Sequence, residues 1–524
     1  MSDLRKTAAT SMKGGVLLFV GNTVALLVNA VGALLVALML SPSEYGIYSV
    51  SLILPSMFIL FSDWGINPAL VQFIARSRSQ GKTEYIRDYQ KAGFIFKVMT
   101  GGILSLSLWI LSDVLAYYLL GRPEIGELVR LASVSILFQP IYQTTISVLT
   151  GYERMDYRAT VSVIHSLVKG ISAPLLVYYG FGVSGAILGH VSSYAVAAGL
   201  GFLLSFKTSI RYEQIEESIG TIICLKEMIG YGLPLFLGNI VGGLTNSFRG
   251  FLMSWFVSDE IIGNYSVASR FMSLIGLVTG SIGVTLFPAF SKFNYKAEPV
   301  KTREAFRASI KYASMIIIPL NVLLAVVSEP LIYTLYGLKY PLAPGFFLLL
   351  LMPMILVGTG SLSMRSFFNS QGDTRVSMKV GLIGSVVSIL FSPIMVWVWG
   401  IPGLIISIFI ASLASNLLGL FVLRENYSFY PDLAHMVRLL LCSALSAGSS
   451  IGVLWLLSLA SPFFNLLISS AIFLLTFLIF APIMRVIKKQ DIVNLDAMLK
   501  ELGVIYLIAR VLFDVEEKII SYTQ

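Results

Sequence analysis

The chain has 524 residues, of which 56% are hydrophobic and only 12% are charged, and its 37 basic and 28 acidic residues give a net charge of +9. An ordinary globular protein has about 25% charged residues, so this composition excludes a soluble enzyme, a disordered regulator and a secreted disulfide-rich domain. The apolar residues form long blocks, without the period-two alternation of a membrane β-barrel. The composition therefore predicts an all-α polytopic membrane protein.

About fourteen transmembrane helices are expected along the chain. They cover residues 14–40, 45–75, 92–120, 128–150, 158–179, 183–206, 229–257, 261–290, 309–336, 342–369, 376–399, 402–423, 433–459 and 463–487. Basic residues occur in every even-numbered loop, whereas the odd-numbered loops hold only Arg122 and Lys339. Because basic loops stay in the cytoplasm, both termini are predicted on the cytoplasmic side of the cell membrane. The positive charge thus reflects topology, and no nucleic-acid partner is expected.

The two halves of the chain resemble each other. The segment GNTVALLVN begins at Gly21 and GNIVGGLTN begins at Gly238, which is 217 positions later (238 − 21), and Tyr48 and Tyr265 are related by the same shift. This repeat predicts two pseudo-symmetric six-helix bundles with a substrate site between them, plus two extra helices. The expected regions are an N-terminal bundle (1–206), a cytoplasmic linker (207–228), a C-terminal bundle (229–424), an additional helix pair (425–489) and a cytoplasmic amphipathic tail (490–524).

Three motifs carry a family resemblance. The pattern YG…DWG…A…R runs from Tyr45 to Arg76, QGDTR begins at Gln371, and a weaker counterpart, GYERMDYR, begins at Gly151. These motifs and the span arrangement resemble the polysaccharide transporters of the multidrug/oligosaccharidyl-lipid/polysaccharide flippase superfamily, in particular Wzx-type flippases. The resemblance covers residues 14–424. It implies alternating access that moves a polyprenyl-(pyro)phosphate-linked oligosaccharide from the cytoplasmic to the outer face for surface glycan synthesis.

Charged residues inside the predicted spans indicate where such a substrate binds. A charge at the centre of a span costs about 2.5–3.5 kcal/mol on insertion scales, so it usually marks a function. Arginine binds phosphate through two parallel hydrogen bonds, and lysine acts as a point charge. The candidates for a cationic cavity that binds the pyrophosphate are Lys97, Lys169, Arg249 and Arg270.

Two further residues are candidates for coupling. Asp63, in the DWG motif, is an ion-coupling candidate for H+ or Na+, and a fixed partner for one of the cations is an equally open alternative. His165 lies one turn from Lys169 and is a candidate proton relay, with a hydrogen-bonded packing residue as the alternative. Aromatic residues near span ends are assigned to the membrane interface rather than to sugar stacking. They are Trp64, Tyr142, Trp255 and Tyr265.

Several other functions remain as alternatives. They are a cation-coupled multidrug exporter of the same superfamily, a lipid II-type flippase and a non-transporting scaffold for glycan assembly. An exporter of cationic drugs would favour carboxylates in its cavity, and the short outer loops leave no room for a catalytic domain, so no enzyme is expected. No GxxxxGK[ST] motif is present in the sequence, and neither a cofactor nor a metal is expected. The expected partners are the lipid-linked glycan, membrane lipids and the glycan polymerase or ligase.

Overall fold

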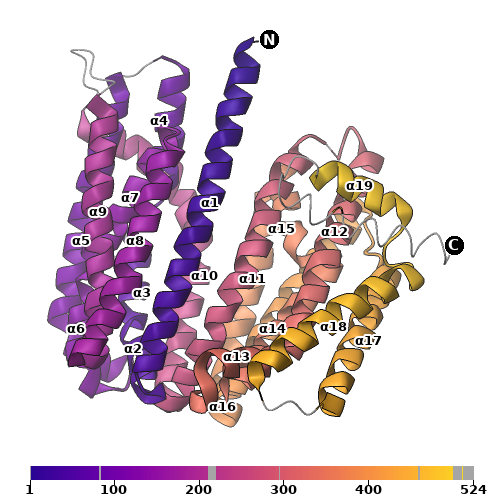
Figure 1. The fold of residues 1–524 in the computed structure, drawn as a ribbon. Coiled ribbons are helices and arrows are strands. Elements are labelled where there is room, and N and C mark those ends of the chain that lie inside the picture. Colours follow the sequence, from indigo (N-terminus) through magenta and orange to yellow (C-terminus); the bar gives the residue numbers. More distant parts are fainter. Residues whose placement is uncertain are drawn as a thin grey trace. The chain divides into compact units, whose positions relative to one another are not determined.

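A computed structural model describes residues 2–81, 84–210, 220–293, 295–457, 461–499 and 510, and no β-strand occurs among them (Figure 1). The prediction of an all-α protein is confirmed. In chain order the α-helices are α1 (Ser2–Met39), α2 (Pro42–Ser51), α3 (Ile53–Leu60), α4 (Ile66–Ser79), α5 (Glu84–Tyr118), α6 (Gly126–Ser133), α7 (Ser135–Gly151), α8 (Met155–Leu176), α9 (Gly182–Ile210), α10 (Thr221–Phe256), α11 (Asp259–Ser291), α12 (Pro299–Val326), α13 (Ser328–Tyr336), α14 (Ala343–Leu351), α15 (Ser361–Ser370), α16 (Thr374–Tyr427), α17 (Leu433–Leu457), α18 (Pro462–Ile483) and α19 (Lys489–Leu499).

Ten helices of the described residues are long and apolar enough to cross a membrane, or eleven if the bent pair Ala343–Thr359 and Ser361–Ser370 is one span. Two of the ten, Met155–Ser209 and Thr374–Tyr427, run for 55 and 54 residues. Since about 20 residues cross the hydrocarbon core, each is long enough for two spans. Each is also broken at a glycine of positive φ, Gly180 (90°) or Gly400 (58°), between two of the predicted spans. The total of about fourteen spans stays a prediction.

The first of two compact units comprises Met1–Ser266 and Ser392–Ile401. Within it, α1 packs against α8 with their backbones close together, because a Cβ atom added at Gly32 would lie 2.5 Å from the Cα of Gly170. Asn29 also donates a 2.5 Å hydrogen bond to the hydroxyl of Ser166. Small residues thus let two apolar helices approach closely enough for a side-chain hydrogen bond between them.

Helix α10 packs against α3, α4 and α5 in this first unit. Gly243 lies against Leu60 of α3, and Gly250 lies against Ile53 of the same helix. The predicted linker at 207–228 is helical at both ends, and its residues 211–219 lie outside the described part of the chain. The predicted domain boundaries stay a prediction.

The second unit comprises Val267–Phe391 and Pro402–Gln524. An aromatic core that includes Phe290, Phe306 and Phe367 joins α11, α12 and α15. At α19, the buried Asp491 accepts a 2.5 Å hydrogen bond from the ammonium of Lys311 on α12. The first part of the predicted tail is therefore a helix docked on α12, and residues 500–509 and 511–524 lie outside the described residues.

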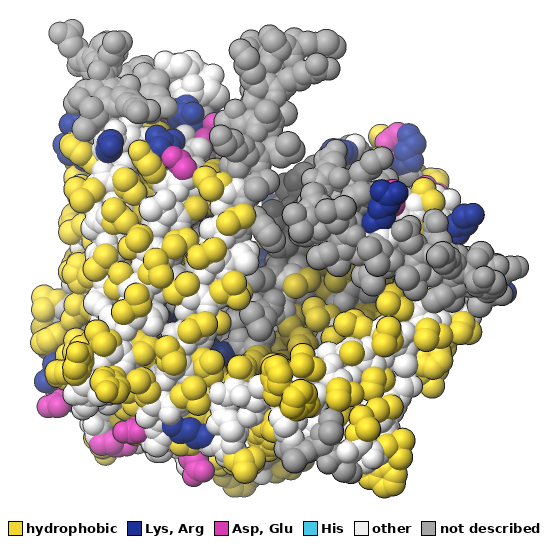
Figure 2. All heavy atoms as spheres, in the orientation of Figure 1, with side chains coloured by type: hydrophobic (Ala, Val, Ile, Leu, Met, Phe, Trp, Pro, Cys, Tyr) yellow, Lys and Arg dark blue, Asp and Glu magenta, His cyan; other side chains and the backbone are white. Residues whose placement is uncertain are grey.

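The surface of the first unit has the distribution expected in a bilayer. Figure 2 shows apolar side chains covering its visible face, with charged side chains gathered at the two ends of the helices. Exposed apolar residues on α5 include Ile103, Leu106 and Ile110, each more than 60% exposed. In water such a surface would aggregate, so it indicates contact with lipid.

Candidate functional site

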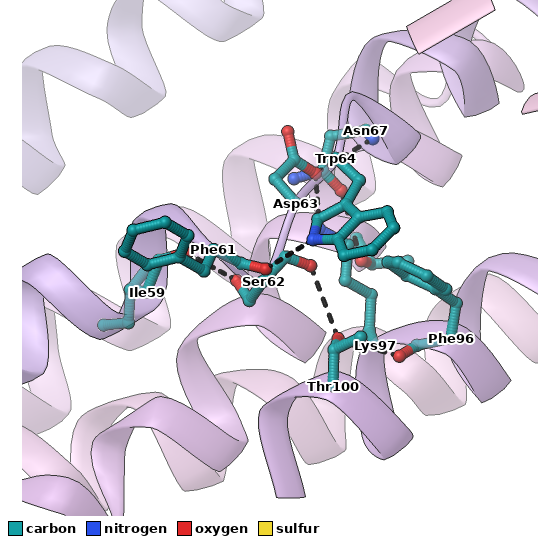
Figure 3. Close-up of polar contacts among 10 residues, drawn as sticks. Ile59, Phe61, Ser62, Asp63, Trp64, Asn67, Phe96, Lys97 and Thr100 are labelled. Atoms are coloured by element: carbon teal, nitrogen blue, oxygen red, sulfur yellow. Dashed lines mark hydrogen bonds and ion pairs between the residues drawn. The ribbon is translucent and has the colours of Figure 1, made fainter. Parts of the chain in front are cut away.

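The second predicted span is interrupted in its middle, at the DWG motif. Helix α3 ends at Leu60 and α4 begins at Ile66. Between them, Trp64 and Gly65 both have positive φ, of 47° and 78°. A chain that reverses its twist here cannot continue the helical hydrogen bonds, so backbone carbonyl groups are left for other partners. Figure 3 shows that Thr100 of the neighbouring helix α5 contacts one of these carbonyl groups, that of Ser62.

Lys97 of α5 is the main partner of this interruption. Its ammonium forms an ion pair with the Oδ1 atom of Asp63, and the same oxygen accepts a 3.2 Å hydrogen bond from the backbone of Asn67 (Figure 3). The Lys97 side chain is fully buried, whereas 32% of the Asp63 side chain is exposed. An isolated buried ammonium is strongly unfavourable. The pairing therefore explains how Lys97 is tolerated, and it brings two of the predicted site residues together.

Further contacts hold the interruption in place. Thr100 of α5 donates to the carbonyl of Ser62 at 3.4 Å, and Thr144 of α7 donates to the side-chain oxygen of Asn67 at 3.2 Å. On another side, a Cβ atom at Gly65 would lie 2.0 Å from the carbonyl oxygen of Gly232 on α10. Three helices thus contact the interruption, which makes it a fixed part of the first unit.

The depth of the ion pair follows from helix geometry. Lys97 lies 21 residues before Tyr118, the last residue of α5 (118 − 97), which corresponds to about 32 Å along a helix. The hydrocarbon core is about 30 Å thick. For a helix along the membrane normal whose C-terminal end is at the predicted outer face, the ion pair lies near the cytoplasmic boundary of the hydrocarbon.

His165 lies among aromatic rings of α7 and α9. Its ring centroid is 5.0 Å from that of Tyr142 and 4.5 Å from that of Tyr194. The residue is 9% exposed, and its Nε2 atom has no hydrogen-bond partner among the described residues. Lys169 is half-buried one turn further along α8. The proton-relay role stays a prediction, and these ring contacts are equally suited to a packing role.

The two predicted arginines belong to different units. Arg249 is half-buried on α10 in the first unit, and Arg270 is exposed on the part of α11 that belongs to the second unit. Their common position in a cationic cavity stays a prediction.

Arg122 is a buried cation with a structural role that its place in a short outer loop does not reveal. It is 9% exposed and forms an ion pair with Asp259. Its guanidinium also donates to the carbonyl oxygens of Ser254 at 2.9 Å and Val257 at 2.7 Å. In return, the Ser254 hydroxyl donates to Leu120 at 2.7 Å. The turn after α5 is thereby fastened to the end of α10, and no spacing signal in the sequence indicates this.

The QGDTR motif has a local structural role in the second unit. The side chain of Gln371 donates to the carbonyl of Phe293 and accepts from the backbone of Tyr295, both at 2.9 Å. Asp373 accepts a hydrogen bond from Tyr427 at the end of α16. The motif therefore ties three segments together at one end of this unit. Within the described residues, no group of three or more His, Cys, Asp or Glu side chains could hold a metal ion.

Comparisons with known proteins agree with the resemblance drawn from the motifs. A family model described as polysaccharide biosynthesis protein matches residues 35–343. The "Probable low-salt glycan biosynthesis flippase Agl15" of Haloferax volcanii is 20% identical over 391 residues, which cover 75% of this chain and 79% of the relative.

Two solved structures share the fold. The lipid II flippase MurJ in an inward closed conformation has a TM-score of 0.72 and 17% identity, covering 89% of this chain and 98% of its own. An inward-facing multidrug resistance transporter of the MATE family of the MOP superfamily has a TM-score of 0.65 and 18% identity, covering 78% of this chain and 98% of its own. The expected helical membrane fold is confirmed.

Proposed function

The chain belongs to the polysaccharide biosynthesis protein family, and on that basis we propose that it is a flippase for a polyprenyl-(pyro)phosphate-linked oligosaccharide. The family match carries this proposal, and the flippase named among the relatives supports it. The glycan head group moves from the cytoplasmic to the outer face while its lipid tail stays in the bilayer. The protein lies in the cytoplasmic membrane with both termini in the cytoplasm, and glycan polymerases or ligases use the translocated substrate.

Intramembrane cations supply the chemistry for the phosphate groups. The free energy of moving a bare pyrophosphate from water into hydrocarbon is prohibitively high. Hydrogen bonds from arginine and lysine replace the hydration that the phosphate groups lose. Lys97 is fully buried and already paired with Asp63, so we assign phosphate binding first to Lys169, Arg249 and Arg270. If Asp63 couples H+ or Na+ to transport, the ion binds to a carboxylate that is already paired with the ammonium of Lys97.

A proteoliposome assay tests the proposal. Vesicles contain the purified full chain and a fluorescent polyprenyl-pyrophosphate oligosaccharide, and an impermeant glycosidase outside reports which head groups are accessible. We expect the protein to make the inner-leaflet pool accessible, while protein-free vesicles keep it protected. The proposal is contradicted if the inner-leaflet head groups of protein-containing vesicles stay protected from the glycosidase under imposed proton and sodium gradients. A cationic dye in the same vesicles then tests the multidrug-exporter alternative.

A further inference from the structure

Trp64 has a backbone conformation that is unusual for its side chain. Its φ of 47° lies in the left-handed region, which a bulky residue rarely adopts and which glycine adopts freely. Such strained positions persist only where the surroundings impose them, and they cluster at ligand-binding and switch sites.

The indole of Trp64 is held rigidly although it is exposed. Its Nε1 atom donates a 2.8 Å hydrogen bond to the carbonyl of Phe61, and its ring meets Phe96 of α5 edge to face at a centroid distance of 5.9 Å (Figure 3). Even so, 42% of the residue remains exposed. Because the only donor of the indole is already used, the exposed part presents carbon surface and π-electrons to a ligand.

A polar group lies directly beside this aromatic surface. The Oδ1 atom of Asp63 is used by Lys97 and by the backbone of Asn67. The Oδ2 atom has no hydrogen bond to the described residues, and 32% of the Asp63 side chain is exposed. The interruption therefore presents a rigid aromatic surface next to a carboxylate oxygen whose position is fixed by the pairing with Lys97.

We propose that Trp64 and Asp63 form a subsite for a neutral sugar ring of the transported glycan. The apolar C–H face of a pyranose packs on the indole, and a ring hydroxyl donates to Oδ2 of Asp63, which adds a charge-assisted hydrogen bond. This inference rests on the proposed function and names the part of the substrate that is recognised here. With the predicted topology this subsite lies toward the cytoplasmic side of the membrane, where a head group enters.

The main competing role for Trp64 is that of an interfacial anchor, as its place in the sequence favours. An anchor supports the protein in any membrane and is indifferent to the glycan, whereas a sugar subsite distinguishes lipids with and without sugars. Trp109 is a matched control, because it is also 42% exposed but lies inside the regular helix α5.

The test measures binding of two probes to the full chain in nanodiscs, a polyprenyl pyrophosphate with an oligosaccharide and the same lipid without one. We expect Trp64→Gly to weaken binding of the glycan-bearing lipid by about two- to tenfold and to leave binding of the glycan-free lipid unchanged. Trp64→Phe should retain part of the preference, and Trp109→Ala all of it. Glycine adopts positive φ without strain, but Trp64→Gly also removes the indole contacts with Phe61 and Phe96, so the unfolding temperature of the variant is measured beside its binding.

The outcomes separate the inference from the function beneath it. If Trp64→Gly binds both lipids as the unaltered protein does, or loses affinity for both equally, no sugar subsite exists at Trp64. If Trp64→Gly unfolds at a lower temperature than the unaltered protein, the variants Trp64→Phe, Trp64→Tyr and Trp64→Leu decide instead. The inference is overturned if all three bind the glycan-bearing lipid with unchanged affinity and keep the full preference for it. If the unaltered protein binds neither lipid and moves neither, the proposed function itself is wrong.

Discussion

The guanidinium of Arg122 and the carboxylate of Asp259 form an ion pair that joins the turn after α5 to the turn between α10 and α11. The second turn is also tightly held from α2, because a Cβ atom added at Gly46 would lie 1.9 Å from the carbonyl oxygen of Asp259. The turn after α5 and helix α2 therefore both contact the short connection between α10 and α11, at the predicted outer end of the first unit.

Replacing Arg122 with alanine should destabilise the first unit. The change removes the ion pair and two hydrogen bonds, and it leaves the carbonyl groups of Ser254 and Val257 without these donors. The side chain of Asp259 is 23% exposed, so water compensates in part and we expect a loss of about 2 kcal/mol. Thermal unfolding in detergent measures this loss. A double-mutant cycle with Asp259→Asn separates the ion pair from the carbonyl contacts, and full stability of Arg122→Ala would contradict the assigned role.

The Asp63–Lys97 ion pair predicts a strong interaction between two substitutions. Asp63→Asn leaves a fully buried ammonium without its counter-charge, which we expect to cost about 3 kcal/mol. Lys97→Met in the same chain should recover much of that loss, because it removes the unpaired charge. Unfolding free energies of the two single variants and the double variant measure the interaction. Simple additivity would mean that the pair does not stabilise the interruption.

The same Asp63→Asn variant tests ion coupling. If Asp63 carries a coupling ion, the transport rate of the Asp63→Asn variant should no longer depend on a proton or sodium gradient. The same loss is expected when Lys97→Met is present to stabilise the variant. Transport with an unchanged rate and unchanged gradient dependence would show that Asp63 serves only as the partner of Lys97.

The contact between Gly65 and Gly232 predicts a sharp difference between two glycines of α10. A Cβ atom at Gly232 would lie 2.3 Å from the carbonyl oxygen of Gly65, whereas one at Gly238 would meet nothing within 4 Å. Gly232→Ala should therefore push α10 away from α4, at a cost of about 1–3 kcal/mol. Gly238→Ala should be neutral or slightly stabilising, because alanine favours a helix. Equal unfolding temperatures for the two variants would refute the close approach.

Arg249 and Arg270 are the substitutions that test the cationic path. Arg249→Ala and Arg270→Ala should each abolish transport in proteoliposomes without reducing membrane insertion, since a phosphate group loses its two-point contact. Lysine at either position should restore transport only in part. Full activity of both alanine variants would exclude these residues from the path.

Local features of the sequence were sufficient for much of this fold. Long apolar blocks predicted the membrane helices, and the glycines at positions 180 and 400 lie in the predicted connections, where the structure has positive φ. The DWG motif, which carries part of the family resemblance, coincides with the interruption between α3 and α4. These properties depend on composition and turn chemistry over a few residues, so they can be read along the chain.

Partnerships between distant residues were decided only by the tertiary structure. The sequence left open whether Asp63 binds an ion or pairs with a cation, and the ion pair with Lys97 exists because α5 passes beside the interruption. Likewise, Arg122 was no more than an outer-loop charge until folding brought it to Asp259, 137 positions away. Hydrophobicity determines which segments enter the membrane, but it is similar on many helix faces. Which faces meet depends on close packing of small residues such as Gly65 and Gly232, and therefore on the fold as a whole.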